Sequence, residues 1–212
     1  MDAYFTFAFL CFTSFITLMN PLGIMPIFMS MTSDLSPNER MHTAKKANIV
    51  AFLTIVGFAL SGQLLFKFFG ISVNSFRMVG GIIFFMMGYD MLQARLVKVK
   101  FNKEASKKKY VNDISITPLA IPMICGPGAI TNSIVLMEDA NNTYKKAILL
   151  ATVFLVCLIS FIVLWSSSKI IKWLGETGNT IMMRLMGLIV MVIAVEFFFS
   201  GLKPILMEII HG

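Results

Sequence analysis

Two clusters of proline and glycine interrupt long apolar stretches of this chain. One is Asn20-Pro21-Leu22-Gly23-Ile24-Met25-Pro26, and the other has Thr117-Pro118 and Pro122 followed by Gly126-Pro127-Gly128. Proline lacks an N–H, so it frees a carbonyl, and a helix that resumes after the break begins with unpaired N–H groups at the positive end of its dipole. Freed carbonyls suit an ammonium and half-helix N-termini suit a carboxylate. A site built from both would suit a zwitterionic amino acid.

The polar side chains in and beside these breaks carry no charge. Their amides and hydroxyls can bind a ligand without the cost of burying an ion, or they can satisfy the backbone that the prolines free. Both interpretations are open for any one of them, and the two breaks together favour a binding function. The candidate substrate-binding residues are Asn20, Pro21, Gly23, Pro26, Thr117, Pro118, Pro122, Gly126, Pro127, Gly128, Thr131 and Asn132.

Two acidic residues interrupt otherwise uncharged stretches and are candidates for coupling transport to a proton or cation. Glu196 lies well inside an apolar stretch, where an ionisable residue is expensive and therefore a functional candidate. Asp90 lies about four residues from the end of its stretch, and an interfacial pair with Arg95 or Lys98 explains it equally well. For Glu196, a structural hydrogen bond between helices is the alternative.

Enzyme signatures are missing from the sequence. The two histidines, His42 and His211, stand far apart, and the three cysteines, Cys11, Cys125 and Cys157, lie in apolar runs without a CxxC pair. No phosphate-binding, dinucleotide-binding or nucleophile-elbow motif occurs. We therefore expect no enzymatic activity, no metal site and no cofactor.

The composition is that of a membrane protein. Of 212 residues 57% are hydrophobic and 14% are charged, and the mean hydropathy is +0.81. Soluble domains are about 45–50% apolar and about 25% charged. The net charge of +7 is confined to gaps between apolar stretches, which argues against nucleic-acid binding. Six stretches are long enough for helical crossings, at residues 3–33, 47–66, 78–94, 114–137, 147–168 and 185–202. An all-α membrane protein with six transmembrane helices, of which the first and fourth are broken, is predicted.

The halves of the chain resemble each other. Arg77-Met78-Val79-Gly80 recurs as Arg184-Leu185-Met186-Gly187 after 107 residues, and Asn20-Pro21 falls on Gly126-Pro127 after 106. A rival register pairs Asn20-Pro21 with Thr117-Pro118. Because three crossings per half is an odd number, the repeats must be inverted. The predicted units are residues 1–94, a basic linker at 95–112, and residues 113–212.

Basic residues predict the orientation. Thirteen of the 18 lysines and arginines lie on one side of the predicted crossings and five on the other. The positive-inside rule then places linker 95–112 in the cytoplasm and both termini outside, in a bacterial-type inner membrane.

The two motifs resemble those of the MarC family of integral membrane proteins. The residues concerned are Asn20-Pro21-Leu22-Gly23 with Pro26, and Pro118-Leu119-Ala120-Ile121-Pro122 leading to Gly126-Pro127-Gly128-Ala129-Ile130-Thr131. The resemblance covers nearly the whole chain, and it departs from the family at Ile24, where an asparagine often follows the first glycine. It implies a relation to the LysE-type amino-acid exporter superfamily.

We therefore expect a secondary transporter that exports or exchanges small neutral amino acids by alternating access. Its partners would be that substrate and the lipid bilayer, and a homo-oligomer is compatible with the sequence. The alternatives are a non-transporting membrane scaffold or stress-related membrane protein and, with less support, an intramembrane enzyme.

Overall fold

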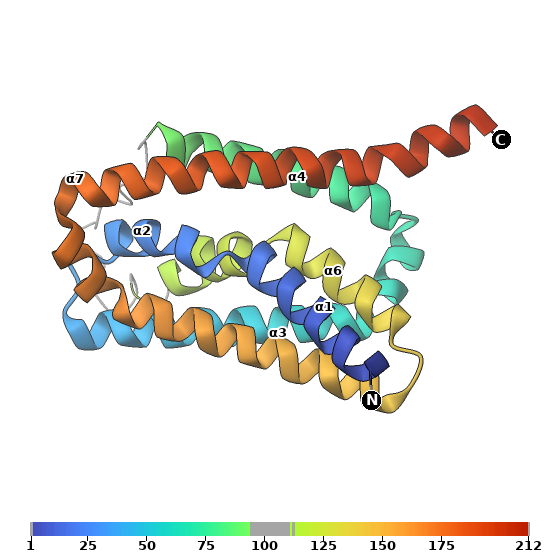
Figure 1. The fold of residues 1–212 in the computed structure, drawn as a ribbon, viewed down its shortest axis with the longest axis horizontal. Coiled ribbons are helices and arrows are strands. Elements are labelled where there is room, and N and C mark those ends of the chain that lie inside the picture. Colours follow the sequence, from blue (N-terminus) through green and yellow to red (C-terminus); the bar gives the residue numbers. More distant parts are fainter. Residues whose placement is uncertain (1, 94–110, 112, 212) are drawn as a thin grey trace.

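The computed structural model describes residues 2–93, 111 and 113–211, and in that part of the chain all regular secondary structure is helical (Figure 1). Five helices are long and apolar enough to cross a membrane, and the pair Ser115–Ile124 and Pro127–Asp139, bent by 59°, has the length and composition of a broken span or a re-entrant loop. The described chain therefore has five or six candidate spans, against the six that the sequence predicts. The elements in chain order are α1 (Asp2–Met19), α2 (Pro21–Met31), α3 (Pro37–Phe69), α4 (Val73–Leu92), η1 (Ser115–Ile124), α6 (Pro127–Asp139) and α7 (Thr143–His211).

Helix α3 begins and ends at residues with clear capping chemistry. Ser36 accepts a hydrogen bond from the backbone N–H of Glu39, whose carboxylate accepts from the N–H of Ser36, and Pro37 occupies the first helical position. At the other end Gly70 has φ 65°, a left-handed conformation that terminates helices. The long second crossing is therefore bounded by local sequence.

Helix α7 contains two crossings joined by a turn. Gly175 has φ 70° and ψ 178°, outside the helical region, and it divides a first segment, Thr143–Ser167, from a second segment, Thr177–Ile210. Between the two segments the chain reverses direction through a short piece of helix that runs across the end of the bundle (Figure 1). Glycine adopts positive φ without the steric cost that other residues incur, which explains why the helix can turn here.

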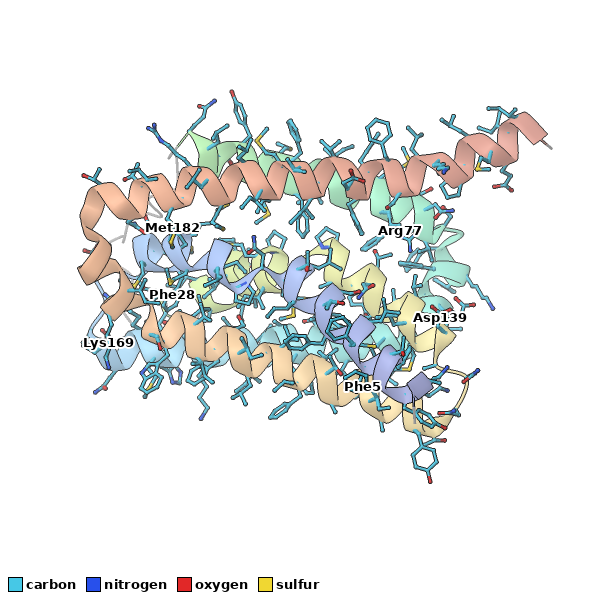
Figure 2. All side chains as sticks on the ribbon, viewed as in Figure 1. Phe5, Phe28, Arg77, Asp139, Lys169 and Met182 are labelled. Carbon is cyan, nitrogen blue, oxygen red and sulfur yellow. The ribbon has the colours of Figure 1, made fainter. Side chains whose placement is uncertain are left out.

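The elements form three layers, with the two broken crossings in the middle. Helices α1 and α2 and the pair η1–α6 lie between α4 with the second α7 segment on one side and α3 with the first α7 segment on the other (Figure 1). Side chains of the layers fill the space between them (Figure 2). Eight of the 11 residues of α2 and eight of the 13 residues of α6 are buried. The short half-helices are therefore the centre of the protein.

Both termini lie at the same end of the bundle (Figure 1). The ring of Tyr4 packs 6.4 Å from that of Tyr144, and the ammonium of Lys145 lies 5.4 Å from the ring of Phe7. Figure 2 shows Arg77 toward this end and Lys169 toward the other. These positions agree with the predicted division of residues between two sides. Linker 95–112 lies outside the described residues apart from Val111.

Candidate functional site

The first break is built by Asn20. This residue has φ 40° and ψ 63°, a left-handed conformation that asparagine tolerates better than most residues. Its side-chain Oδ1 accepts a hydrogen bond of 3.1 Å from the N–H of Gly23, and Pro21 occupies the first position of α2. Asn20 therefore ends α1 and caps α2 at once.

The amide nitrogen of Asn20 is not used by this cap. Asn20 Nδ2 is buried and has no hydrogen-bond partner among the described residues. Gly23 makes room for the amide, because a Cβ on Gly23 would lie 2.8 Å from Asn20 Cγ. Oδ1 therefore satisfies a backbone group of the break, as the structural alternative predicts. Nδ2 remains a buried donor that can still bind an acceptor.

The second break lies in η1 and at the start of α6. Thr117 and Ile121 have extended backbone angles, with φ −130° and −126°, inside an otherwise helical segment. Each precedes a proline, which disfavours the helical conformation for the residue before it. The peptide bonds Thr117–Pro118 and Ile121–Pro122 are cis. The crossing then bends by 59° before α6.

The N-terminus of α6 differs from that of α2 in its capping. Pro127 occupies the first position after Gly126, and within the described chain no side chain caps this end. The N–H groups of Gly128 and Ala129 belong to the first turn, which lacks intrahelical acceptors. These amides lie at the positive end of the helix dipole, so α6 is the more open of the two half-helix termini to an anionic group.

The ring of Phe84 joins the two breaks. Phe84 belongs to α4, is 6% exposed and lies against Gly126. A Cβ on Gly128 would lie 3.3 Å from Phe84 Cε2 and 3.1 Å from Cδ2 of Leu18, two residues before Asn20. Phe84 also lines the cavity that contains Asn20. The structure therefore brings residues of both breaks together.

That cavity has a volume of about 40 Å³ and an uncharged lining. Thr17 and Asn20 supply its polar side chains, and Met123 of η1 contributes from the second break. Since a buried water needs about 10–15 Å³ of such space, there is room for about three or four waters and not for an amino acid. The remaining lining residues are Leu18, Met19, Gly23, Ile24, Ile27, Phe84, Met87, Met91, Val190 and Ile193.

None of the residues predicted around the second break, Gly126, Pro127 and Gly128 included, lines this cavity. Thr131 is buried, and its hydroxyl donates to the carbonyl of Pro127 at 2.9 Å, which matches the structural interpretation. Asn132 has a buried Nδ2 without a partner among the described residues, yet it does not line the cavity. Thr117 is exposed, and Pro118 and Pro122 are half-buried outside the lining.

Pro26 and the two acidic candidates also lie outside the lining. Pro26 is buried inside α2, where it interrupts the helical hydrogen-bond ladder. Asp90 and Glu196 are exposed on the outer faces of α4 and α7. Among the described residues no group of three or more His, Cys, Asp or Glu could hold a metal ion.

Sequence reasoning missed the apolar part of the cavity. Phe84, Met87 and Met91 of α4 were not among the predicted site residues. A signal was present, because Gly80, Gly81 and Gly88 flank Phe84 at three- and four-residue spacing. Glycines at this spacing let neighbouring helices approach and seat the ring between them.

Comparison with known proteins identifies relatives along nearly the entire chain. The family described as MarC family integral membrane protein matches residues 5–206. A UPF0056 membrane protein of Pyrococcus abyssi is 38% identical over 198 residues, covering 93% of this chain and 94% of the relative. One from Buchnera aphidicola subsp. Schizaphis graminum is 34% identical over 200 residues, covering 94% and 93%. No solved structure matches this chain.

Proposed function

The chain belongs to the MarC family of integral membrane proteins, and on that premise we propose that it is a secondary transporter of small neutral amino acids. It works by alternating access, outward or by exchange, across a bacterial-type inner membrane. The observation that carries the proposal is that two half-helices, each begun by a proline, lie in the middle layer of the bundle (Figure 1), and that Asn20, which precedes one of them, has a buried Nδ2 with no partner among the described residues. Discontinuous helices of this kind are the usual sequence pointer to a transporter site.

Two inverted three-helix repeats are part of the proposal. Pro21 and Pro127 each occupy the first position of a half-helix and are 106 residues apart. The layers support the same pairing, because each outer layer combines a helix from each half and the middle layer holds both broken crossings (Figure 1).

The close contacts between α4 and α7 support the same shift. A Cβ on Gly81 would lie 2.8 Å from the carbonyl oxygen of Ala194, and one on Gly88 would lie 2.8 Å from that of Gly187. Adding 106 to Gly81 gives Gly187, and adding 106 to Gly88 gives Ala194, so a shift by one repeat exchanges the two contacts. An inverted pair of repeats predicts this exchange.

The proposal gives each charged group of a zwitterionic amino acid a partner. The carboxylate accepts from the uncapped N–H groups of Gly128 and Ala129 and from Asn20 Nδ2. The ammonium faces the carbonyl of Thr17, which Pro21 deprives of its helical donor. A small side chain packs against the methionines of α4. Because a cavity of about 40 Å³ is too small for an amino acid, α4 and its partners must move outward to admit the substrate.

Transport is tested with purified protein in proteoliposomes. We expect counterflow of radiolabelled alanine, glycine, serine or threonine above protein-free vesicles, with lysine and glutamate as charged controls. Gly128→Leu should abolish this flux, because the new side chain fills the space beside Leu18 and Phe84. Gly57→Leu is the matched control, since a Cβ at Gly57 meets nothing within 4 Å.

Two outcomes would contradict the proposal. Wild-type protein that carries none of the four amino acids is not the transporter proposed, and wild-type flux in Gly128→Leu removes the site from this position. If Gly128→Leu fails to fold, the double variant Leu18→Ala with Gly128→Leu is measured in its place. The smaller side chain at position 18 relieves the overlap with the new leucine.

A further inference from the structure

A second and much larger cavity lies between α3 and the first segment of α7, with a volume of about 610 Å³. It shares no lining residue with the cavity at Asn20. One part of the lining is polar, with Asn38, His42, Lys45 and Asn48, and it includes no acidic residue among the described residues. The rest is apolar, with Phe52, Phe154, Leu158 and Phe161 prominent. The groove is therefore amphipathic and electropositive at its polar part.

The polar part lies at one end of α3. The uncharged stretch of α3 starts at Ala47. The polar lining residues lie around this point, since Lys45 and the two before it precede Ala47 and Asn48 follows it directly. From Asn38 to Phe52 the groove follows fourteen residues of α3, which at 1.5 Å per residue is about 21 Å along the helix axis. It therefore runs from the membrane interface into the hydrocarbon core, at the end of the bundle that holds the α2–α3 loop (Figure 1).

Asn48 gives the groove an unpaired polar group at its inner polar edge. The residue is 5% exposed, its Nδ2 donates to the carbonyl of Ala44 at 2.9 Å, and its Oδ1 is buried with no partner among the described residues. A buried acceptor without a donor costs about 1–3 kcal/mol. A ligand of this groove should therefore offer a hydrogen-bond donor close to its charged group.

We propose that this groove binds one molecule of phosphatidylglycerol from the adjoining membrane leaflet. Its phosphate binds at Lys45 and His42, and a hydroxyl of its terminal glycerol donates to Asn48 Oδ1. One acyl chain lies along the aromatic side chains that α3 and α7 contribute to the groove. This inference does not depend on transport by the site at Asn20.

Retention of lipid on the intact protein tests the proposal. The protein is reconstituted in vesicles with equal amounts of phosphatidylglycerol, phosphatidylethanolamine and phosphatidylcholine of identical acyl chains, extracted in mild detergent and weighed by native mass spectrometry. We expect one phosphatidylglycerol per chain, retained at least about fivefold over either zwitterionic lipid. That ratio corresponds to one lysine acting on one anionic headgroup.

Variants separate the groove from general attraction to a basic surface. Lys45→Gln should reduce retention of phosphatidylglycerol about fivefold. Its neighbour Lys46 does not line the groove, so Lys46→Gln, which removes the same charge, should retain lipid like wild type. Asn48→Leu should also lower the retention of phosphatidylglycerol. If this buried variant does not fold, Lys45→Gln still tests the groove, because Lys45 is exposed and its substitution leaves the core intact.

Three results would overturn the inference. If Lys45→Gln and Lys46→Gln lose equal amounts of retained phosphatidylglycerol, the lipid is held by the general positive charge of the surface and not by the groove. Equal retention of phosphatidylethanolamine or phosphatidylcholine would mean that the groove recognises acyl chains and not this headgroup. Wild-type protein without any retained lipid would mean that there is no site.

Discussion

The contact between Gly88 of α4 and Gly187 of α7 predicts a large effect from a single methyl group. A Cβ on Gly88 would lie 2.8 Å from the carbonyl oxygen of Gly187 and 2.9 Å from the backbone nitrogen of Met191. Ordinary contact begins at 3.4 Å, so Gly88→Ala must separate the helices by about 0.6 Å at this point. Because both neighbours are backbone atoms, no side-chain rotation relieves the overlap.

The magnitude follows from packing. A gap of 0.5–1 Å forfeits about a quarter to a half of each dispersion contact across it, and overpacking by one group typically costs about 1–3 kcal/mol. For a chain of this size that is about 2–4 °C in melting midpoint per kcal/mol. Gly57→Ala is the matched control, because Gly57 lies in the interior of α3 beside open space, where alanine is favoured by about 0.5–1 kcal/mol.

A thiol-reactive fluorophore reports unfolding directly, because Cys11, Cys125 and Cys157 are all free and buried. Gly88→Ala should melt below wild type and Gly57→Ala at or above it. Gly187→Ala should act like Gly88→Ala, and the double variant should cost less than the sum, since one separation relieves both overlaps. Gly88→Ala melting at or above wild type, or strict additivity of the pair, would refute the close contact.

The remaining predictions concern orientation and coupling. A cysteine introduced at Ser106 should react with an impermeant reagent from the cytoplasmic side only, because the basic asymmetry places linker 95–112 inside; labelling from outside would reverse the topology. If Glu196 couples transport to protons, Glu196→Gln should abolish uptake driven by a pH gradient and spare exchange. Asp90→Asn should reduce gradient-driven uptake less, because exposed ion pairs contribute about 0–1 kcal/mol. Gradient-driven uptake at the wild-type level in Glu196→Gln would mean that Glu196 is not the coupling residue.

The crossings and both breaks could be predicted because their causes are local. A charge-free stretch of sufficient length is a crossing wherever it occurs, and proline removes a backbone donor in any context. The rival register for the repeat is also informative. Pro21 and Pro127 both start half-helices, whereas Thr117-Pro118 lies within η1 in an extended conformation. The start of a half-helix is therefore a feature that Asn20-Pro21 shares with Gly126-Pro127 and not with Thr117-Pro118, although Asn20 is left-handed and Gly126 is extended.

The lining of the cavity could not be predicted because it depends on which helix faces meet. The α4 and α7 crossings are apolar on most sides, so periodicity does not tell a lipid-facing position from a buried one. Glu196 looked deep from its distance to the ends of its stretch, yet it is exposed on the outer face of α7. Lys45 likewise was counted only as a topology signal and His42 only as a histidine without a histidine neighbour, whereas both line the groove between α3 and α7.

Asn20 allows the structural and the ligand-binding interpretations to be separated by measurement. Glycine adopts φ 40° freely, so Asn20→Gly loses only the side-chain cap, at a few tenths of a kcal/mol. Asn20→Ala loses the cap, at about 1 kcal/mol, and adds about 1–2 kcal/mol for the left-handed conformation.

The two variants should therefore differ in melting midpoint and agree in transport. Both remove the Nδ2 donor, so both should lose amino-acid flux if the amide binds substrate. Asn142→Gly is the matched control, because Asn142 Oδ1 likewise accepts from a first-turn N–H, that of Lys145 at 2.8 Å, away from the cavity. If Asn20→Gly transports like wild type and only the less stable Asn20→Ala loses flux, Asn20 is a helix cap and does not bind substrate. Flux lost in Asn20→Gly and kept in Asn142→Gly would tie the broken helix to the substrate, because glycine preserves the backbone of the break and removes only the amide.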